Sequence, residues 1–209
     1  MQKLSKDFYR RDDVALIAQQ LLGKYIITNF EKQYTVGRIV ETEAYAGIID
    51  KASHAYNNRR TARTEVMFGE AGHAYVYLCY GIHHLFNVVC NKPDAPDAVL
   101  IRGIEPVEGL SIMQQRFHQN KFNSSIGRGP GNVSKALGLS VKHTGLPLQQ
   151  PVLFLAEEKQ EPFTMMASAR IGVDYAGDHA KWLYRFFIQD HPQVSKHALN
   201  KTAVALQSA

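Results

Sequence analysis

The stretch from residue 38 to residue 87 decides the fold, because strand-like runs alternate there with turns and one polar loop. It reads RIVETEAYAG at 38–47, DKASHAY at 50–56, TARTEVMFGEAGHAYVYLCYG at 61–81 and HHLFN at 83–87. Successive side chains of a strand point to opposite faces, so Ile39, Glu41 and Glu43 are expected on one face. Two acids beside an isoleucine on one strand face need either ionic partners or a chemical purpose.

The second half of this stretch predicts a hairpin. The runs 74–80 and 84–90 are rich in aromatic and β-branched residues, and Gly81 lies between them. Residues 50–70 show no clear periodicity and predict a long loop, and long ordered loops in compact domains usually carry function.

Outward from this stretch, strand-like runs recur and helical patterns are few. A helix is expected to start after Asp12 or Asp13 and to stop at Gly23, with others at 107–119 and 133–139. Further strands are expected at 25–30, 34–42, 98–105, 152–156, 169–173 and 183–188. This pattern predicts an α+β fold: a single domain over residues 1–209, with a curved, mainly antiparallel sheet, flanking helices and a frayed tail from about residue 195.

Charge and composition favour an anionic partner. The 209 residues carry a net charge of +5 and a pI of about 9.1. No Asp or Glu occurs from Gly109 to Ala156, so a basic face is expected, although an ordinary solvated surface explains the charge equally well. Two cysteines without a CxxC pattern indicate a reduced cytosolic protein. The first residues lack the apolar region of a signal peptide, and no run approaches a membrane span, so no membrane association is expected.

Carboxylates, rings and cations together suggest hydrolysis on a flat heterocycle within a polyanion. Glu43 could activate water, and enzymes that act on a base inside duplex nucleic acid flip it out and hold it between rings. Arg102 lies on a mostly apolar strand face, where an arginine is costly unless paired. Simpler interpretations are a surface ion pair for Glu43, a buried structural salt bridge for Arg102, and core packing for any one tyrosine.

A long composite motif carries a family resemblance. ETEAY, ASHAY, MFGEAG, YVYLCYG, Asn87, VLIRGIEPVEG, RGPGNVSKALGL, ARIGVDYAG and LYRFF occur in this order. Together they resemble the alkyladenine (3-methyladenine) DNA glycosylase family from about Leu21 to about Phe187. The resemblance implies a monofunctional enzyme of base-excision repair that cuts the N-glycosidic bond of damaged purines in duplex DNA. Candidate lesions are 3-methyladenine, 7-methylguanine, hypoxanthine and ethenoadenine.

The resemblance also assigns roles to residues near the reacting bond. Glu43 matches the general base of the family, which activates the water, whereas Glu41 precedes that position and is expected to be structural. Arg102 is expected to help hold the water, and the backbone carbonyl of Ile171 matches a third contact to it.

Five further residues match the base-binding part of the family pattern. Tyr45 and His54 are expected on one side of the flipped base and Tyr77 on the other. Tyr80 matches the tyrosine that intercalates into the gap left in the duplex. Asn87 matches the residue that crowds the 2-amino group of guanine. After Gly81 the sequence departs from some relatives, which affects lesion range more than the reaction.

Other function classes stay open from the residues alone. Nine histidines invite a metal hydrolase, but His83 and His84 are adjacent and no HExxH or zinc-type Cys/His spacing occurs, so no metal or cofactor is expected. A non-catalytic nucleic-acid-binding module fits the charge and tyrosines but leaves Glu43 with Arg102 unexplained. A glycoside hydrolase could use Glu41 and Glu43 as a pair. The expected protein is a monomer, cytoplasmic in a bacterium or nuclear in a eukaryote.

Overall fold

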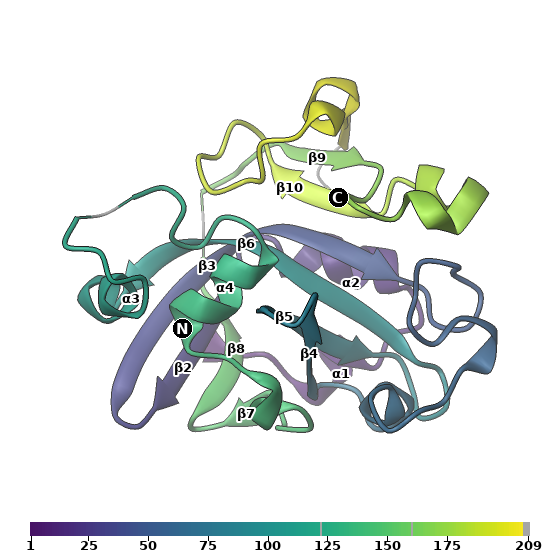
Figure 1. The fold of residues 1–209 in the computed structure, drawn as a ribbon, viewed down its shortest axis with the longest axis horizontal. Helices are drawn as coiled ribbons and strands as arrows, with labels where there is room; N and C mark the ends of the chain where they lie inside the picture. The colour runs from purple at the N-terminus through teal and green to yellow at the C-terminus, as the bar shows by residue number, and fades with distance from the viewer. Residues whose placement is uncertain (122, 160, 207–209) are drawn as a thin grey trace.

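The computed structural model describes residues 1–121, 123–159 and 161–206, and it has an α+β architecture built on antiparallel strands (Figure 1). The α-helices are α1 (Lys6–Tyr9), α2 (Val14–Leu21), α3 (Leu110–Arg116) and α4 (Pro130–Leu137). The 3-10 helices are η1 (Tyr56–Asn58), η2 (Glu65–Phe68), η3 (Val141–His143), η4 (Asp174–Lys181) and η5 (Ala198–Thr202). The strands are β1 (Gln2–Lys3), β2 (Tyr25–Phe30), β3 (Gln33–Tyr45), β4 (Ala74–Cys79), β5 (His83–Cys90), β6 (Asp97–Glu108), β7 (Gln149–Gln150), β8 (Leu153–Glu157), β9 (Met165–Ser168), β10 (Arg185–Ile188) and β11 (Val204–Leu206).

The long strand β3 organises the sheet. One of its edges pairs with β2 as far as Arg38 and then with β10 from Glu41 to Glu43, while the other edge pairs with β6. The sheet therefore forks within β3, and the two branches run in the orders β1-β8-β2-β3 and β3-β10-β9-β11. The hairpin β4–β5 extends the sheet from β6. The predicted curved, mainly antiparallel sheet is consistent with this arrangement.

Two irregularities in the pairing of β3 with β6 lie at the fork. Ile39 pairs with Ile104, Glu41 with Gly103 and Thr42 with Ile101, so Val40 and Arg102 are extra residues in their strands. Bulges of this kind bend a strand and redirect a side chain. Arg102 therefore leaves the regular alternation that the sequence predicted for it.

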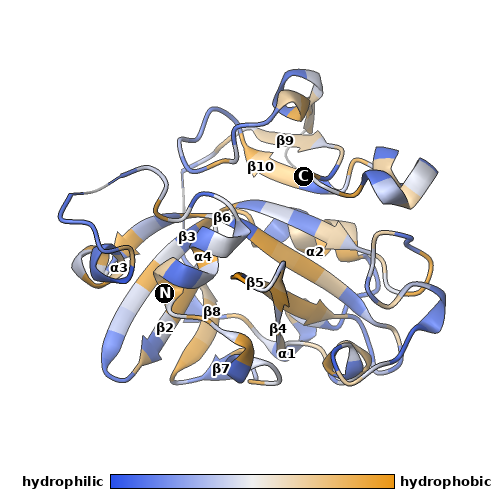
Figure 2. Ribbon diagram, in the orientation of Figure 1, coloured by the Kyte–Doolittle hydropathy of each residue, from blue (hydrophilic) through white to orange (hydrophobic). Residues whose placement is uncertain are grey.

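Apolar side chains from the sheet, α2 and α4 form the main core. Ile17 and Leu21 of α2, Ile39 of β3, and Val133 and Leu137 of α4 are fully buried in one cluster. The predicted start of α2 is confirmed, because the Asp13 side chain accepts a hydrogen bond from the Leu16 amide at 2.8 Å. Figure 2 shows hydrophobic colours along the central strands and hydrophilic colours on many of the loops.

Three expected elements differ in the structure. The helix expected at 133–139 is α4, which begins at Pro130 and ends at Leu137. The helix expected at 107–119 begins only at Leu110, because β6 continues to Glu108 and Gly109 adopts a left-handed φ of 76°. The strand expected at 169–173 is wrong, since β9 ends at Ser168. Gly172 has a φ of 75°, and the Arg170 side chain turns inward to the buried Asp50, so this segment forms a loop that ends beside the site.

The frayed tail expected from about residue 195 is also wrong over the described part of the chain. Strand β11 pairs with β9, and the Ser195 amide donates to Glu41 Oε2 at 2.8 Å. Asn200 Oδ1 accepts from Arg185 Nη1 at 2.9 Å. Figure 1 shows this yellow segment beside β9 and β10. Residues 207–209 lie outside the described residues.

No described helix is both long enough and apolar enough to cross a membrane. Within residues 1–121, 123–159 and 161–206, no three His, Cys, Asp or Glu side chains are grouped in a way that could hold a metal ion.

Candidate functional site

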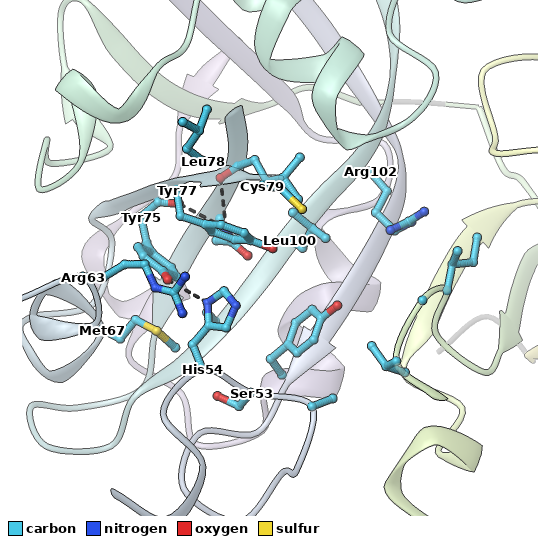
Figure 3. Close-up of a pocket in the computed structure, with 18 of the residues that line it drawn as sticks. Ser53, His54, Arg63, Met67, Tyr75, Tyr77, Leu78, Cys79, Leu100 and Arg102 are labelled. Carbon is cyan, nitrogen blue, oxygen red and sulfur yellow. Dashed lines mark hydrogen bonds between the residues drawn. The ribbon is translucent and has the colours of Figure 1, made fainter. Parts of the chain in front are cut away.

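A cavity of about 390 Å³ lies between the β4–β5 hairpin, the loop 50–70 and the segment that follows β9. Its volume falls in the range of ~300–1,000 Å³ that is typical of small-molecule sites. Seven of the eight residues that the sequence singled out line it: Tyr45, His54, Tyr77, Tyr80, Asn87, Arg102 and Ile171. Figure 3 shows His54 and Tyr77 on one side of the cavity and Arg102 on the other.

Glu43 is the eighth residue, and it lies directly behind the cavity wall. Its side chain is fully buried. Oε1 accepts from the Ile171 amide at 2.8 Å, and Oε2 accepts from the Tyr45 hydroxyl at 2.8 Å and from Arg102 Nη1 at 3.3 Å. All three donors belong to residues that line the cavity, so the carboxylate stands one side chain away from whatever occupies it.

Ile171 contacts Glu43 in a different way from the one expected. The sequence suggested a role for its backbone carbonyl, whereas its backbone amide is the group that binds the carboxylate. Residues 170–173 form a loop rather than a strand, which brings this amide to Glu43. The role of the carbonyl stays a prediction.

Arg102 bridges the two carboxylates of β3. Its Nε donates to Glu41 Oε1 at 3.1 Å and its Nη1 to Glu43. Burial alone would lower the pKa of Arg102, but the carboxylates of Glu43 and Glu41 outweigh it, so the pKa lies above its usual value. The guanidinium is therefore a permanent cation at the inner end of the cavity.

Of the two carboxylates that Arg102 bridges, Glu41 has the structural role. It is fully buried and also accepts from Arg185 Nε at 2.7 Å and from the Ser195 amide. Burial opposes its ionisation, but the charges of Arg102 and Arg185 hold the pKa of Glu41 below its usual value. Every contact of Glu41 fixes the framework around Arg102, and Glu41 is absent from the cavity wall.

Tyr45 links the carboxylate to the aromatic wall. Burial, followed by the charge of Glu43, raises the pKa of Tyr45 well above its usual value. The phenol therefore stays protonated and donates a hydrogen bond to Glu43. The Arg170 guanidinium lies 4.8 Å from the centre of the Tyr45 ring. Arg170 also donates to both carboxylate oxygens of the fully buried Asp50 and to the Ala44 carbonyl, which holds the ring from one side.

His54, Tyr75 and Tyr77 form the opposite aromatic wall. The structure therefore differs from the expectation that His54 lies on the same side as Tyr45, because the His54 ring contacts the ring of Tyr77. His54 Nδ1 lies 2.8 Å from the Tyr75 hydroxyl, and the His54 and Tyr77 rings meet edge to face at 4.6 Å (Figure 3). The Tyr75 and Tyr77 rings stack at 5.5 Å. Tyr75 is only 2% exposed, in agreement with the core packing that was one interpretation for any single tyrosine.

Tyr80 projects from the tip of the β4–β5 hairpin. It is 93% exposed, the most exposed of the large hydrophobic side chains in the described residues. Tyr80 and Gly81 both have positive φ values, 50° and 73°, and the Ile82 amide closes the turn on the Cys79 carbonyl. A left-handed conformation is unfavourable for tyrosine, and such strain concentrates at functional sites. The cost of this backbone conformation and the exposure of the tyrosine ring to water both indicate a functional role for Tyr80 at the mouth of the cavity.

Asn87 is held by the backbone and also lines the cavity. Its side-chain amide donates to the backbone carbonyls of Tyr75 at 3.1 Å and Leu85 at 3.2 Å. The same residue lines the cavity, where the two hydrogen bonds hold the amide group in place.

Four residues near the site were missed by the sequence analysis: Asp50, Arg63, Arg170 and Tyr175. Arg63 and Tyr175 line the cavity, and Asp50 and Arg170 form the buried ion pair behind Tyr45. A signal for Arg170 was present, because it is a charged residue directly before Ile171 in a run read as a strand. Nothing local connects it with Asp50, which lies 120 residues earlier in the chain.

His54 is expected to titrate far below an ordinary histidine. Burial, then the charges of Arg63 and Arg59, lower its pKa from 6.5 to about 4. The folded state therefore binds fewer protons than the unfolded chain between these values, so the stabilisation from a neutral His54 is present above pH 6.5 and lost as pH falls toward 4. An NMR titration, with His54→Gln to assign the resonance, measures it. A midpoint near 6.5 would contradict the burial and charge environment described above.

Comparisons with known proteins agree with the resemblance. The family model described as Methylpurine-DNA glycosylase (MPG) matches residues 7–192. Three relatives, each named "Putative 3-methyladenine DNA glycosylase", come from bacteria. The Clostridium novyi (strain NT) protein is 40% identical, over 94% of this chain and 100% of its own. The Desulfitobacterium hafniense (strain Y51) protein is 41% identical, over 93% and 99%. The Chlamydia pneumoniae protein is 46% identical, over 88% and 94%. With such matches along most of its length, the chain belongs to the methylpurine-DNA glycosylase family.

Proposed function

We propose that the protein is a monofunctional DNA glycosylase that removes alkylated or deaminated purines from duplex DNA by hydrolysis. The observation that carries the proposal is the position of Glu43. A fully buried carboxylate, held by donors from Tyr45, Arg102 and Ile171, stands directly behind a cavity with aromatic walls. Family membership supports the same reaction class.

The cavity suits a flipped purine base. Tyr45 lies on one wall and Tyr77 with His54 on the other, and rings bind bases because every base has a π-face. Tyr80 at the exposed tip would enter the duplex and occupy the space that the base leaves, as inserted side chains do in other DNA-bending proteins. Asn87, whose side-chain amide is held by two backbone carbonyls, would contact the edge of the purine.

In the proposed reaction, the oxygen of a water molecule attacks C1′ of the deoxyribose. The bond between C1′ and the base nitrogen breaks, and its electron pair leaves with the base. Glu43 takes the proton of the water, and its negative charge stabilises the positive sugar in the transition state. Arg102 and the Ile171 backbone would hold the water beside Glu43. A base such as 3-methyladenine already carries positive charge and leaves readily, whereas hypoxanthine needs a proton.

Two other function classes explain the site less well. A non-catalytic binding module has no use for a buried glutamate and arginine at the inner end of the cavity. A glycoside hydrolase would need Glu41 and Glu43 both free to act on the sugar, but Glu41 is occupied by Arg102, Arg185 and the Ser195 amide. We propose that the protein acts as a monomer on the chromosome, which in a bacterium lies in the cytoplasm.

A panel of duplex oligonucleotides tests the function. Each carries 3-methyladenine, 7-methylguanine, hypoxanthine or ethenoadenine, and the assay scores free base in the presence of a metal chelator. Strand cleavage is scored before and after alkali. The expected result is released purine with strand breaks only after alkali, since none of the described residues that line the cavity is a lysine that could attack the sugar as an amine. Absence of release from every lesion would overturn the proposal.

Replacing Tyr80 is expected to weaken lesion binding more than it slows the chemical step. Flipping a base costs a few kcal/mol of unstacking, and this cost is smallest for a base that is already poorly paired. Tyr80→Ser should therefore lose most affinity for a well-paired lesion and least for a mismatched one. Equilibrium binding and single-turnover rates on the two duplexes measure this. Equal losses on both would indicate that Tyr80 acts through hairpin structure alone.

A further inference from the structure

Arg63 is a charged residue of the cavity that the reaction described above does not use. It belongs to the loop 50–70, its side chain is exposed, and it still lines the cavity beside His54 and Tyr77 (Figure 3). Its guanidinium carbon lies 5.9 Å from the centre of the Tyr77 ring. Among the described residues no side chain or carbonyl forms a hydrogen bond or ion pair with Arg63. Its neighbour Arg60, by contrast, pairs with Glu65 and Asp94.

The charge of Arg63 is not balanced at this end of the cavity. Within the described part of the chain, the residues that line the cavity include no Asp or Glu. Arg102, the other arginine of the wall, is neutralised by Glu41 and Glu43. Arg63 has no such partner in the described part of the chain, and after burial its charge is the largest cause of the low pKa of His54. A base held between Tyr45 and Tyr77 would therefore meet a net positive charge on the Arg63 side.

We propose that Arg63 determines specificity by favouring neutral purines that carry a hydrogen-bond acceptor on the exposed edge over purines that carry a positive charge. A guanidinium has five donors and no acceptor, so it can bind an exocyclic oxygen such as O6 of hypoxanthine. It repels a base that is itself a cation, such as 7-methylguanine, which also has O6 and therefore differs from hypoxanthine at this edge in its charge. The proposal deepens the proposed function and depends on it.

A phosphate contact is the competing role for an exposed arginine on a DNA-binding protein. Loss of such a contact would weaken binding of all duplexes alike and make binding less sensitive to salt. An edge contact would instead change the ratio between lesions. Arg59 offers a matched control, because it lies in the same loop and also lowers the pKa of His54 but does not line the cavity.

The test compares wild type, Arg63→Gln, Arg63→Lys and Arg59→Gln. Single-turnover excision rates are measured for hypoxanthine and 7-methylguanine in the same duplex sequence, with affinity at several salt concentrations. Arg63→Gln should lower the hypoxanthine-to-7-methylguanine rate ratio by about tenfold, the effect of roughly 1.4 kcal/mol. Arg59→Gln should leave the ratio within about twofold, since a charge further away in water is strongly screened. Arg63→Lys keeps the positive charge but lacks the planar guanidinium with its fixed donors. Its rate ratio should therefore lie between those of wild type and Arg63→Gln.

Two results would overturn the inference without touching the proposed function. One is an unchanged ratio with a weaker salt dependence in Arg63→Gln, which would assign Arg63 to a phosphate. The other is a wild-type enzyme that excises 7-methylguanine but none of the neutral lesions. Failure of the proposed function is recognised separately, because wild type would then release no base at all.

Discussion

Replacing Glu43 with glutamine is expected to abolish most excision while leaving lesion binding near that of wild type. Loss of a general base typically costs 10²–10⁴-fold in rate, or roughly 3–5 kcal/mol of transition-state stabilisation. Glutamine has the shape of glutamate and keeps one oxygen acceptor, but it can neither take a proton from water nor stabilise a positive sugar. Single-turnover excision from ethenoadenine duplexes measures the rate, and fluorescence anisotropy measures the affinity.

The surroundings of Glu43 make this test specific. Arg102 keeps Glu41 as a partner when Glu43 is neutralised, so the arginine is not left as an uncompensated buried charge. The fold of Glu43→Gln is therefore expected to persist. Near-normal excision by a folded Glu43→Gln enzyme would rule out Glu43 as the base and with it the proposed water mechanism.

Replacing Glu41 with glutamine is expected to lower the stability of the fold. Glu41 is fully buried and compensates two buried arginines, Arg102 and Arg185. Removing one partner of a buried ion pair costs about 3–5 kcal/mol, because the remaining charge stays buried without compensation. Glu41→Gln should therefore lower the free energy of unfolding by this amount in urea denaturation. Arg185 keeps Ser168 and Asn200 as acceptors, which favours the lower end of the range.

The pH dependence of stability gives a second measure of Glu41. Its pKa in the folded state lies below the usual value of 4.5, so the folded state binds fewer protons than the unfolded chain in acid. The stabilisation is present above pH 4.5 and is lost as pH falls through the folded-state pKa. Glu41→Gln should lose this part of the acid sensitivity.

A double-mutant cycle with Arg185→Gln is the control. The two substitutions should be less destabilising together than the sum of their separate effects, because each removes the same ion pair. Wild-type stability of Glu41→Gln would show that the buried network contributes nothing net, and additive losses would show that Glu41 and Arg185 are not coupled.

Local sequence patterns predicted much of the site. Strand alternation placed Glu41 and Glu43 together, and Arg102 does contact both. Gly81 between two strand-like runs predicted the hairpin whose tip exposes Tyr80. The shared face of the two glutamates and the hairpin depend on neighbours a few residues apart, so propensity and periodicity are sufficient to predict them. The contacts of Arg102 span 59 and 61 residues and were not predictable in this way.

The chain order alone could not predict the long-range contacts that complete the site. Arg170 meets Asp50 across 120 residues, and the Ser195 amide meets Glu41 across 154. For this reason the segment 169–173 was expected to be a strand and the tail from about residue 195 to be frayed. Both segments are instead held by partners from β3 or from the loop that follows it.

The sequence by itself determined most of the strands, the hairpin, the family and the residue types at the reacting end. The tertiary structure decided how the sheet forks at β3, where the bulge at Arg102 lies and which distant groups surround Glu43. The physical reason is the low tolerance of a protein interior for unpaired charge. Once Glu41, Glu43 and Asp50 are buried, each needs donors in three dimensions, and only the folded chain brings Arg185, Ile171 and Arg170 to them.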